Sequence, residues 1–549
     1  MFDTPLRYWR TIRHLKMRQL VWRVRLRLTS ARIDAAQPAP PLRKPAGAWQ
    51  PGPARAASLI GPATFRFLNQ AHALPPVGGW DDPALEKLWR YNLHYFDDLA
   101  GLRPELITRW IAENPIGQGT GWEPYPLSLR LVNWSKWLAA GNAPPAGMLE
   151  AMAHQARWLE QRLEWHLLGN HLFANAKALA FAGTLFDGPE AERWRATAQA
   201  IIRDELPEQI LPDGGNFERS PMYHAIFLED VLDLANLAGR APGLVSAEDL
   251  AIYREVAGRM IPWLRGMTHP DGGIALFNDA AIGIAPSLAE LEGYAARLGI
   301  LATAGEEGDT LSAITWLDSG YVRLGYGREA VALLDVAPVG PDYLPGHAHA
   351  DTLSFELSVG GSRFIVNGGT SRYGLGPERE RERGTAAHST VEVGGQNSSE
   401  VWAGFRVARR AMPFDLEMET RTDAVSVACS HDGYARLPGR PIHRRRWDFS
   451  HGRLAVIDRV APGAQDAIAR FILHPGIAVS PAGEGGFACR APDGTMVRIV
   501  ARRGVARLEP AAYAPEFGLS MPTQAIAVHL SEGGSDVEIQ WGTSTDVGK

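Results

Sequence analysis

The chain has 549 residues, too many for one ordinary core, and its length predicts two or three domains. Its 45% hydrophobic and 21% charged content indicates a folded, soluble globular protein and excludes a disordered one. No uninterrupted apolar run reaches the roughly 18 residues that a membrane span needs. A formal net charge of −5 argues against a general nucleic-acid binder. Two cysteines, Cys429 and Cys489, exclude a disulfide framework and a cysteine-pair metal site.

The N-terminal segment is strongly basic. It holds nine Lys/Arg before residue 34 and one acid, Asp3. It lacks the continuous apolar region and cleavage site of a secretory signal. Two placements stay open: a basic amphipathic helix on an anionic membrane, and packing on the protein's own surface, which we favour. Residues 34–65 are rich in Pro and Ala, which predicts a linker or an extended wrap. We therefore group the basic N-terminus and this linker as one segment, residues 1–79.

From about residue 80 to 300 the apolar spacing is helical. The expected helices cover residues 82–100, 103–113, 126–140, 146–168, 171–186, 190–206, 221–239, 247–267 and 286–299. Pro-Asp-Gly-Gly occurs at 212–215 and again 58 residues later, an interval that suits two helices with their loops. Stacked helical hairpins of this kind predict a solenoid or a closed (α/α) toroid over residues 80–309.

After about residue 310 short strands alternate with glycine turns. The expected strands are Tyr321–Leu324, Ala330–Asp335, Thr352–Val359, Ser362–Val366, Ser389–Val393, Ala424–Cys429, His443–Phe449, Arg453–Val460, Ala467–Leu473, Met496–Ala501, Ala525–Leu530 and Asp536–Trp541. Strands without intervening helices predict an antiparallel β-sandwich over residues 310–549. The expected fold class is α+β multidomain, an N-terminal (α/α) toroid followed by a C-terminal antiparallel β-sandwich. The boundary is expected near 300–318.

Histidines gather where these strands begin. His347, His349 and Asp351 alternate, so an early strand start puts them on one face. His388 stands at the start of another strand. With His349 and His388, the amide of Asn367 can complete a metal shell, because zinc takes histidine together with oxygen donors. Solvated surface histidines are the alternative.

Two motifs in the helical half carry candidate catalytic side chains. Asn170 and His171 stand at a helix start, where capping is the ordinary explanation and a sugar site the alternative. A helix is expected from Pro221, with Tyr223 and His224 in its first turn. The positive helix end there favours a phenolate, which suits a tyrosine proton shuttle. A buried tyrosine that packs the helix end is the alternative.

Further residues are candidates for binding substrate. On one helix Arg130, Asn133 and Trp134 share a side, where they can bind a sugar carboxylate and stack on its ring, although helix packing also explains them. The Arg/Glu alternation at 379–383 predicts a salt-bridged loop, and it can also place Arg383 at a cleft. We assign these residues to substrate binding with the remaining candidates, His224, Glu218 and Tyr373.

These motifs resemble the heparinase II/III family of polysaccharide lyases and its alginate-lyase relatives. The resemblance runs from about Tyr91 to Trp402. It rests on GNHLFANAKAL, DGGNFERSPMYH, HPDGG, GHAHADTLSFEL, FIVNGGTSRYG and AAHSTVEVGGQNSSEVW. It implies an (α/α) toroid with a β-sandwich, and β-elimination on uronic-acid polysaccharides.

The resemblance also implies roles for individual residues. It puts Asn170 and His171 at the substrate carboxylate, Tyr223 at the proton-transfer position and His347 opposite. It implies one structural divalent metal, usually zinc, at His349, Asn367 and His388. The family pattern generally has Asp where this chain has Asn367.

Two rival functions remain. One is a glycoside hydrolase with paired carboxylates such as Glu218 and Asp213, and the other is a non-catalytic polysaccharide-binding protein of an exopolysaccharide system. Only a lyase leaves a double bond in its product. The expected partner is an acidic polysaccharide, heparin-like, alginate-like or capsular, with no nucleic acid and with peripheral membrane contact through the basic N-terminus. The family is often periplasmic, but no clear signal is present, so the cytoplasm stays open.

Overall fold

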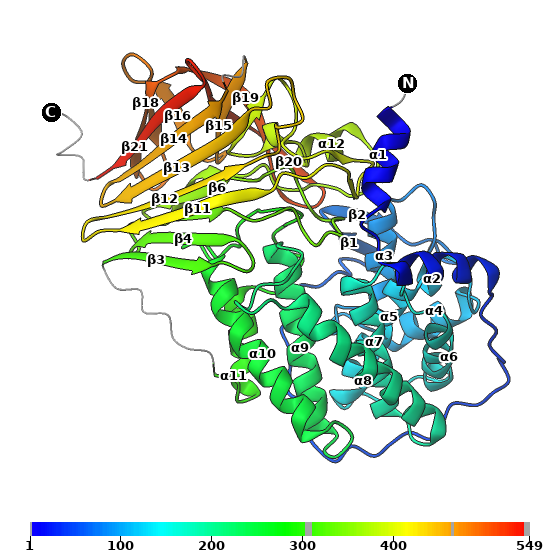
Figure 1. Cartoon of the computed structure of the whole chain (residues 1–549). Coiled ribbons are helices and arrows are strands. Elements are labelled where there is room, and N and C mark those ends of the chain that lie inside the picture. The colour runs from blue at the N-terminus through cyan, green and yellow to red at the C-terminus, as the bar shows by residue number, and fades with distance from the viewer. Residues whose placement is uncertain (1–2, 302–309, 463–465, 543–549) are drawn as a thin grey trace.

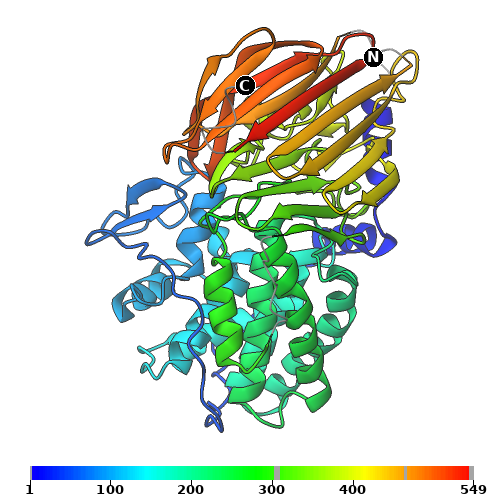
Figure 2. The same ribbon diagram turned by 90° about the vertical axis from the view of Figure 1, so that its left-hand side faces the viewer.

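The computed structural model describes residues 3–301, 310–462 and 466–542 (Figure 1). Helices form one half of the molecule and antiparallel sheets the other, as Figure 2 also shows. The predicted order, a helical region followed by a β-sandwich region, is confirmed. The predicted boundary near 300–318 includes residues 302–309, which lie outside the described residues.

The helices that correspond to the predicted ones are α3 (Lys87–Tyr95), α4 (Pro104–Glu113), α5 (Pro124–Ala139), α6 (Met148–Gln161), α7 (Gly169–Leu185), α8 (Pro189–Gln209), α9 (Pro221–Arg240), α10 (Ala247–Gly266) and α11 (Leu288–Arg297), with the 3-10 turn η1 (Thr120–Trp122). Seven of the nine predicted helices begin and end within about three residues of their predicted limits, whereas the predicted 82–100 and 146–168 are helical only over α3 and α6. Ser220 caps α9 by accepting a hydrogen bond from the Tyr223 N–H at 3.3 Å. Successive helices pack side by side, α7 on α8 and α9 on α10.

The repeated Pro-Asp-Gly-Gly motif closes the same turn after α8 and after α10. Asp213 Oδ1 accepts from the Gly215 N–H at 3.0 Å, and Asp271 Oδ1 accepts from the Gly273 N–H at 2.9 Å. The second oxygen of each aspartate points to the sandwich, where Ser319 and Arg363 donate to it at 2.7 Å. The repeat therefore ties the rim of the helical region to the sheets.

The sandwich consists of two large antiparallel sheets. One has the order β11-β12-β13-β14-β21-β18-β17-β16, and the other β19-β20-β15-β7-β6-β5-β4-β3 with β8 also on β15. The strands are β3 (Leu311–Trp316), β4 (Tyr321–Tyr326), β5 (Ala330–Asp335), β6 (Phe355–Val359), β7 (Ser362–Val366), β8 (Val391–Val393), β11 (Pro413–Thr420), β12 (Ala424–His431), β13 (Ile442–Ser450), β14 (Arg453–Ala461), β15 (Ala467–Leu473), β16 (Ala478–Pro481), β17 (Gly486–Arg490), β18 (Met496–Arg503), β19 (Val505–Glu516), β20 (Leu519–His529) and β21 (Gly534–Trp541). Alternating apolar side chains from both sheets fill the core between them.

The predicted set omits the strands β3, β11, β16, β17 and β19, and it also omits several short elements. These short elements are the hairpin β1 (Thr64–Phe67) and β2 (Gln70–Ala73), the pair β9 (Val401–Trp402) and β10 (Arg406–Val407), the 3-10 turn η2 (Thr385–Ala387) and the helix α12 (Pro377–Glu382). The stretch predicted as a salt-bridged loop is therefore largely helical. Pro377 at its first position explains the start.

The basic N-terminus forms α1 (Asp3–Ile12) and α2 (Met17–Leu28), which pack on the protein's own surface. On α1, Tyr8 packs edge-to-face on Trp402 of the sandwich region at 4.9 Å. On α2, Gln19 Nε2 donates to the carbonyl of Leu167 at 3.2 Å. Among the described residues, no helix combines the length and apolar character needed to cross a membrane.

A buried ion pair lies inside the sandwich. Arg445 donates to both oxygens of Asp458, at 2.7 and 2.9 Å, and His443 Nε2 lies 2.8 Å from the same carboxylate. All three side chains are fully buried. Burial opposes the charge of Asp458, but Arg445 outweighs it and the pKa of this carboxyl is lowered.

We expect Asp458→Asn to lower the free energy of unfolding by about 3–5 kcal/mol, because it leaves the Arg445 charge buried without its partner. The matched control is Asp448→Asn, whose partner Arg446 is largely exposed, and it should cost less than about 1 kcal/mol. Urea unfolding followed by circular dichroism measures both. Equal losses in the two variants would contradict this account of the buried pair.

Candidate active site

The candidate active site lies where the rim of the helical region meets the sandwich. Three stretches build it: the start of α9, the loop between α10 and α11, and the loop that precedes β6. Asp279 from the second stretch lies under His347 and His349 from the third, with Nδ1 of His347 and Nε2 of His349 at 2.9 and 2.8 Å from its carboxylate oxygens.

Asp279 is the shared partner of this cluster. Arg379 of α12 binds both of its oxygens, with Nη2 at 2.6 Å from Oδ2. Asp279 and Arg379 are both fully buried. Although burial opposes its charge, Arg379 and the two histidines hold the pKa of Asp279 well below its usual range. An ionised Asp279 accepts hydrogen from both histidines, which fixes the proton of His347 on Nδ1 and leaves Nε2 as a free acceptor.

Tyr223 lies face to face with His347. Their ring centroids are 4.0 Å apart, and the Tyr223 hydroxyl is 3.0 Å from that of Tyr373. Burial raises the pKa of Tyr223 well above its usual value. The favourable effect of the helix end on a phenolate stays a prediction, and burial acts against the charged form.

Glu218 stands on the other side of His347. Its Oε2 lies 3.7 Å from His347 Nε2, and only 2% of its side chain is exposed. Among the described residues, no side chain donates a hydrogen bond to either oxygen. Burial raises the pKa of Glu218. A carboxyl of this kind can hold a proton at a pH where exposed glutamates are ionised.

Asn170 and His171 lie in the first turn of α7, beside Glu218. His171 Nδ1 is 3.0 Å from Oε1 of the buried Glu164, and the His171 ring lies 4.4 Å from that of Tyr125. Burial opposes a charge on His171, but Glu164, together with Glu218 and Glu123, outweighs burial and the pKa of His171 is raised. A cationic imidazole at the positive end of a 17-residue helix favours a bound anion.

Each segment that the helical region contributes to the site contains, or lies next to, a residue with strained backbone. The non-glycine residues Leu168, Arg219 and Asn278 have φ of 67°, 58° and 56°. The carbonyl of Arg219 accepts hydrogen bonds from Asn278 Nδ2 at 2.9 Å and from the Tyr321 hydroxyl at 2.7 Å. Conformations of this kind cost about 1–3 kcal/mol and cluster where side chains must be aimed.

His349, Asp351 and His388 can together hold a metal ion. Their ligand atoms all lie within 4.8 Å of one another, and all three are buried. His349 Nδ1, which is unprotonated because Nε2 donates to Asp279, faces His388 Nε2 at 3.3 Å. Asn367 lies beside this cluster with both ends of its amide engaged, by Ser354 at 3.3 Å and Ser389 at 3.2 Å. Asp351, whose Oδ2 accepts from the Asn278 N–H at 3.0 Å, supplies a carboxylate oxygen to this set, and the set fits a divalent cation.

The structure removes several residues from the predicted binding set. Arg130 is fully buried and donates to Gln155, His94 and Gly121. Trp134 is fully buried in the helical core. His224 is buried against Trp263, and burial lowers its pKa to about 3. The prediction that these side chains contact substrate is wrong, because Arg130 and Trp134 lie on buried sides of α5 and His224 on a buried side of α9.

Arg383 also differs from its predicted role. It is 1% exposed and donates from Nε and Nη2 to the carbonyl of Ala348, at 3.0 and 2.8 Å. Burial lowers its pKa to about 9. Arg383 therefore holds the backbone between His347 and His349 and does not reach a cleft. Asn133 is half-buried and donates to the Tyr95 carbonyl at 3.1 Å.

Four residues of the site were not predicted: Asp279, Arg379, Glu164 and Phe405. Phe405 is 40% exposed, with its ring 6.1 Å from His347 and 5.2 Å from Tyr373. One signal for Asp279 was available in the sequence. Glu218 and Tyr223 follow the first Pro-Asp-Gly-Gly turn closely, and Asp279 follows the second turn in the same way. Nothing local marks Phe405.

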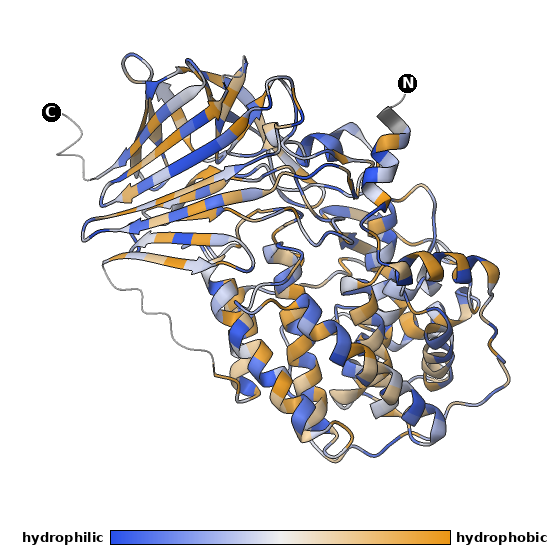
Figure 3. Cartoon of the chain, viewed as in Figure 1, coloured by the Kyte–Doolittle hydropathy of each residue, from blue (hydrophilic) through white to orange (hydrophobic). Residues whose placement is uncertain are grey.

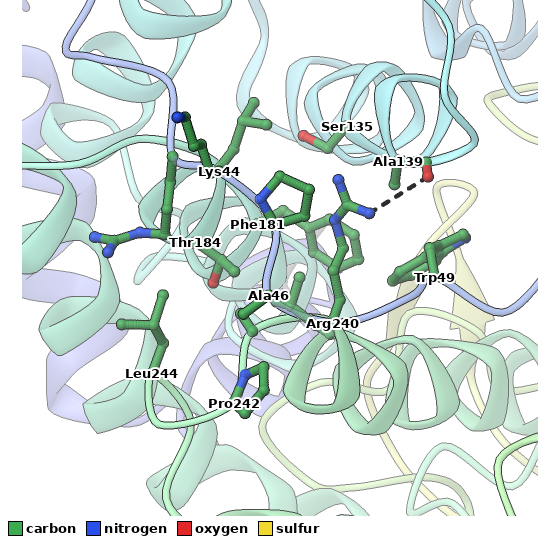
Figure 4. Close-up of a pocket in the computed structure, with 15 residues that line it drawn as sticks. Lys44, Ala46, Trp49, Ser135, Ala139, Phe181, Thr184, Arg240, Pro242 and Leu244 are labelled. Atoms are coloured by element: carbon green, nitrogen blue, oxygen red, sulfur yellow. Dashed lines mark hydrogen bonds between the residues drawn. The ribbon is translucent and has the colours of Figure 1, made fainter.

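A separate pocket lies between residues 43–49 and helices α5, α7 and α9, with a volume of about 180 Å³ (Figure 4). Lys44, Trp49, Phe181 and Arg240 are among its lining residues. None of the residues that line it belongs to the Asp279 cluster.

Two family models match the chain. The heparinase II/III N-terminus model matches residues 109–295, and the heparinase II/III-like C-terminal model matches residues 310–542. The heparin-sulfate lyase of Pedobacter heparinus is 26% identical over 317 residues, which are 52% of this chain and 47% of that protein. That of Bacteroides thetaiotaomicron is 25% identical over 344 residues, 53% of this chain and 48% of that protein. The chain thus matches about half the length of these curated relatives.

Solved structures share the fold. A crystal structure of heparinase III has a TM-score of 0.65 at 19% identity, covering 83% of this chain and 76% of that one. The heparan sulfate lyase HepC of Pedobacter heparinus has a TM-score of 0.58 at 19% identity, covering 87% and 80%. Both pair a helical region with a sandwich in the arrangement seen in this chain.

We expect Glu164→Gln to lower the pKa of His171, because the mutation removes the carboxylate that stabilises the imidazolium and leaves the opposing effect of burial. In the wild type the pKa of His171 is raised, so the imidazolium persists to higher pH. In Glu164→Gln the imidazolium should lose its proton at a lower pH than in the wild type. Histidine NMR titration measures the shift. Glu160→Gln, which affects an exposed pair with Arg193, serves as control. An unchanged His171 titration in Glu164→Gln would contradict the assignment.

Proposed function

This chain belongs to the heparinase II/III family, and on that premise we propose that it is a polysaccharide lyase that cleaves a uronic-acid-containing polysaccharide by β-elimination. The observation that supports this most strongly is the pairing of Tyr223 with His347. One residue comes from the helical region and the other from the sandwich region, with their rings in contact at 4.0 Å. Clefts between domains are common ligand sites.

In the proposed reaction His347 is the base. Its Nε2 takes the proton from C5 of the uronate, next to the carboxylate, while Asp279 holds the other ring nitrogen. The electron pair of the C5–H bond forms the C4–C5 double bond, and the C4–O4 bond breaks. Tyr223 donates its phenolic proton to the departing O4, and Tyr373 hydrogen-bonds the Tyr223 hydroxyl. The raised pKa of Tyr223 keeps that proton in place before reaction.

The C5 proton is only weakly acidic while the neighbouring carboxylate is fully charged. Asn170 and the imidazolium of His171 are proposed to bind that carboxylate and stabilise the negative charge that develops on it. Glu164 supports this role because it raises the pKa of His171. Protonated Glu218 can donate a further hydrogen bond at the same place, and its raised pKa favours that form.

Sugar rings need an aromatic surface as well as charge. Tyr373 and the exposed Phe405 flank His347 and offer such a surface, with Asn133 at the rim near Tyr95. We propose a glycosaminoglycan-like substrate, since the relatives are named for heparin sulfate and the proposed carboxylate site suits any uronate. Alginate-like and capsular polymers contain the same group.

The hydrolase alternative needs a second free carboxylate beside Glu218. Asp213 does not supply it, because both of its oxygens accept hydrogen bonds, from Gly215 and from Ser319. The geometry therefore favours elimination over hydrolysis.

We also propose a structural divalent ion, zinc by family resemblance, held by His349, Asp351 and His388. When bound, it would neutralise the buried carboxylate of Asp351 and brace the loop that carries His347. The residues of this chain perform every proton transfer described above.

We expect Tyr223→Phe to reduce formation of the unsaturated uronate, followed by its ultraviolet absorbance, by about 10²–10⁴-fold, because the proton donor to O4 is lost. Tyr253→Phe, a buried tyrosine of α10 away from the site, is the matched control and should keep full activity. Both variants should retain the wild-type melting temperature. Full activity in Tyr223→Phe would rule out its assignment as the proton donor.

Metal analysis of purified protein should find about one divalent ion per chain. His349→Ala and Asp351→Asn should both lose it, since each removes a donor, whereas Asn367→Ala should keep it. The measurement is inductively coupled plasma mass spectrometry after dialysis. Loss of metal in Asn367→Ala with retention in Asp351→Asn would contradict the ligand set proposed for this structure.

A further inference from the structure

Helix α2 docks on the protein through Gln19, Trp22 and Leu26, the three residues of the helix that are least exposed. Gln19 is 1% exposed and donates to the carbonyls of Leu167 and Tyr343, at 3.2 and 3.3 Å. Trp22 stacks on Trp165 with ring centroids 6.1 Å apart. A surface helix of a globular protein normally turns its apolar residues towards the core, whereas α2 leaves a second apolar stripe exposed beside its docked side.

The apolar stripe of α2 faces outward. Met17, Val21, Val24 and Leu28 are exposed by 72%, 54%, 58% and 81%. Their spacing of three to four residues places them on one side of the helix. Figure 3 shows apolar residues along α2 at the surface of the molecule.

Helix α1 continues this surface. Leu6, Trp9 and Ile12 are exposed by 48%, 55% and 50% and recur every three residues. With Tyr8 and Leu20, which are exposed by 46% and 39%, the two helices leave nine large apolar side chains exposed within 23 consecutive residues. Clustered exposure of this kind marks an interaction site, in contrast to single exposed side chains.

The charge around these residues is strongly positive. The first 33 residues hold nine Lys/Arg and one acid, whereas the whole chain has a net charge of −5. The exposed cations include Arg13, Arg18, Arg25 and Arg27, which flank the apolar stripe. A helix with an outward apolar stripe and basic flanks matches the surface of an anionic bilayer, where apolar side chains enter the acyl boundary and cations meet phosphates.

We propose that α1 and α2 form a membrane-docking surface that holds this protein on an anionic lipid bilayer. This inference is independent of the proposed lyase activity. Because Gln19 binds the backbone of Leu167, three residues before Asn170, the docking helix is connected to the segment that carries Asn170 and His171. Docking would then hold the candidate site close to the bilayer surface, where a membrane-associated acidic polymer would meet it.

The experiment is flotation of the full chain with vesicles of phosphatidylglycerol and phosphatidylcholine in equal parts, and with vesicles of phosphatidylcholine alone. We expect binding to the first, at least tenfold weaker binding to the second, and weakening of the first by high salt. Val24→Glu should reduce binding at least tenfold, because it puts an acid into the apolar stripe. Val505→Glu, at a position of the sandwich that is 67% exposed, is the matched control and should bind as the wild type does.

Wild-type protein that does not float with either vesicle would overturn the proposal, as would equal flotation of Val24→Glu and the wild type. Analytical ultracentrifugation tests whether a second copy of the chain, and not a bilayer, covers the apolar stripe. A wild-type dimer that Val24→Glu converts to monomer would assign the stripe to a second copy of the chain and would also overturn the proposal. Circular dichroism and the melting temperature confirm that both variants fold.

Discussion

The carboxylate of Asp279 is the interaction on which the site depends. One buried anion binds Arg379 through both oxygens and holds His347 and His349 at 2.9 and 2.8 Å. It brings together a loop of the helical region, a loop of the sandwich region and α12. An unpaired buried carboxylate would be strongly destabilising, so the three partners and the anion require one another. The same contacts determine which nitrogen of His347 is free.

The location of the site follows from this constraint. Each half of the protein supplies an incomplete set: Tyr223, Glu218 and His171 come from the helices, and His347, Tyr373 and Phe405 from the sheet side. The aspartates of the two Pro-Asp-Gly-Gly turns hold the halves in register, through Ser319 and Arg363. Strained backbone at Leu168, Arg219 and Asn278 then aims the helical-side segments. Separation of the two halves would therefore dismantle the site.

Sequence reasoning succeeded where the signal is local. The start of α9 at Pro221 with its Ser220 cap, the paired turns and the change from helical to strand periodicity all come from short-range chemistry. It failed for Asp279, whose partners His347, His349 and Arg379 lie 68, 70 and 100 residues away in the chain. It also misplaced Arg130 and Trp134, because α5 is buried on several sides and its pattern does not say which side faces a cleft. Family resemblance nominated Tyr223, His347 and His171 as candidates, but it did not indicate the contact of Tyr223 with Tyr373 or that of His171 with Glu164.

The central claim is elimination at a uronate, and the most direct test is the mass of the product formed in ¹⁸O-labelled water. Heparan sulfate, alginate and a bacterial capsular uronate are incubated with the protein, and the new chain ends are examined by mass spectrometry. The account predicts fragments that carry a double bond and no ¹⁸O from solvent, because no water is added when the C4–O4 bond breaks. Saturated fragments with one ¹⁸O each would contradict it, and so would binding of all three polymers without any cleavage.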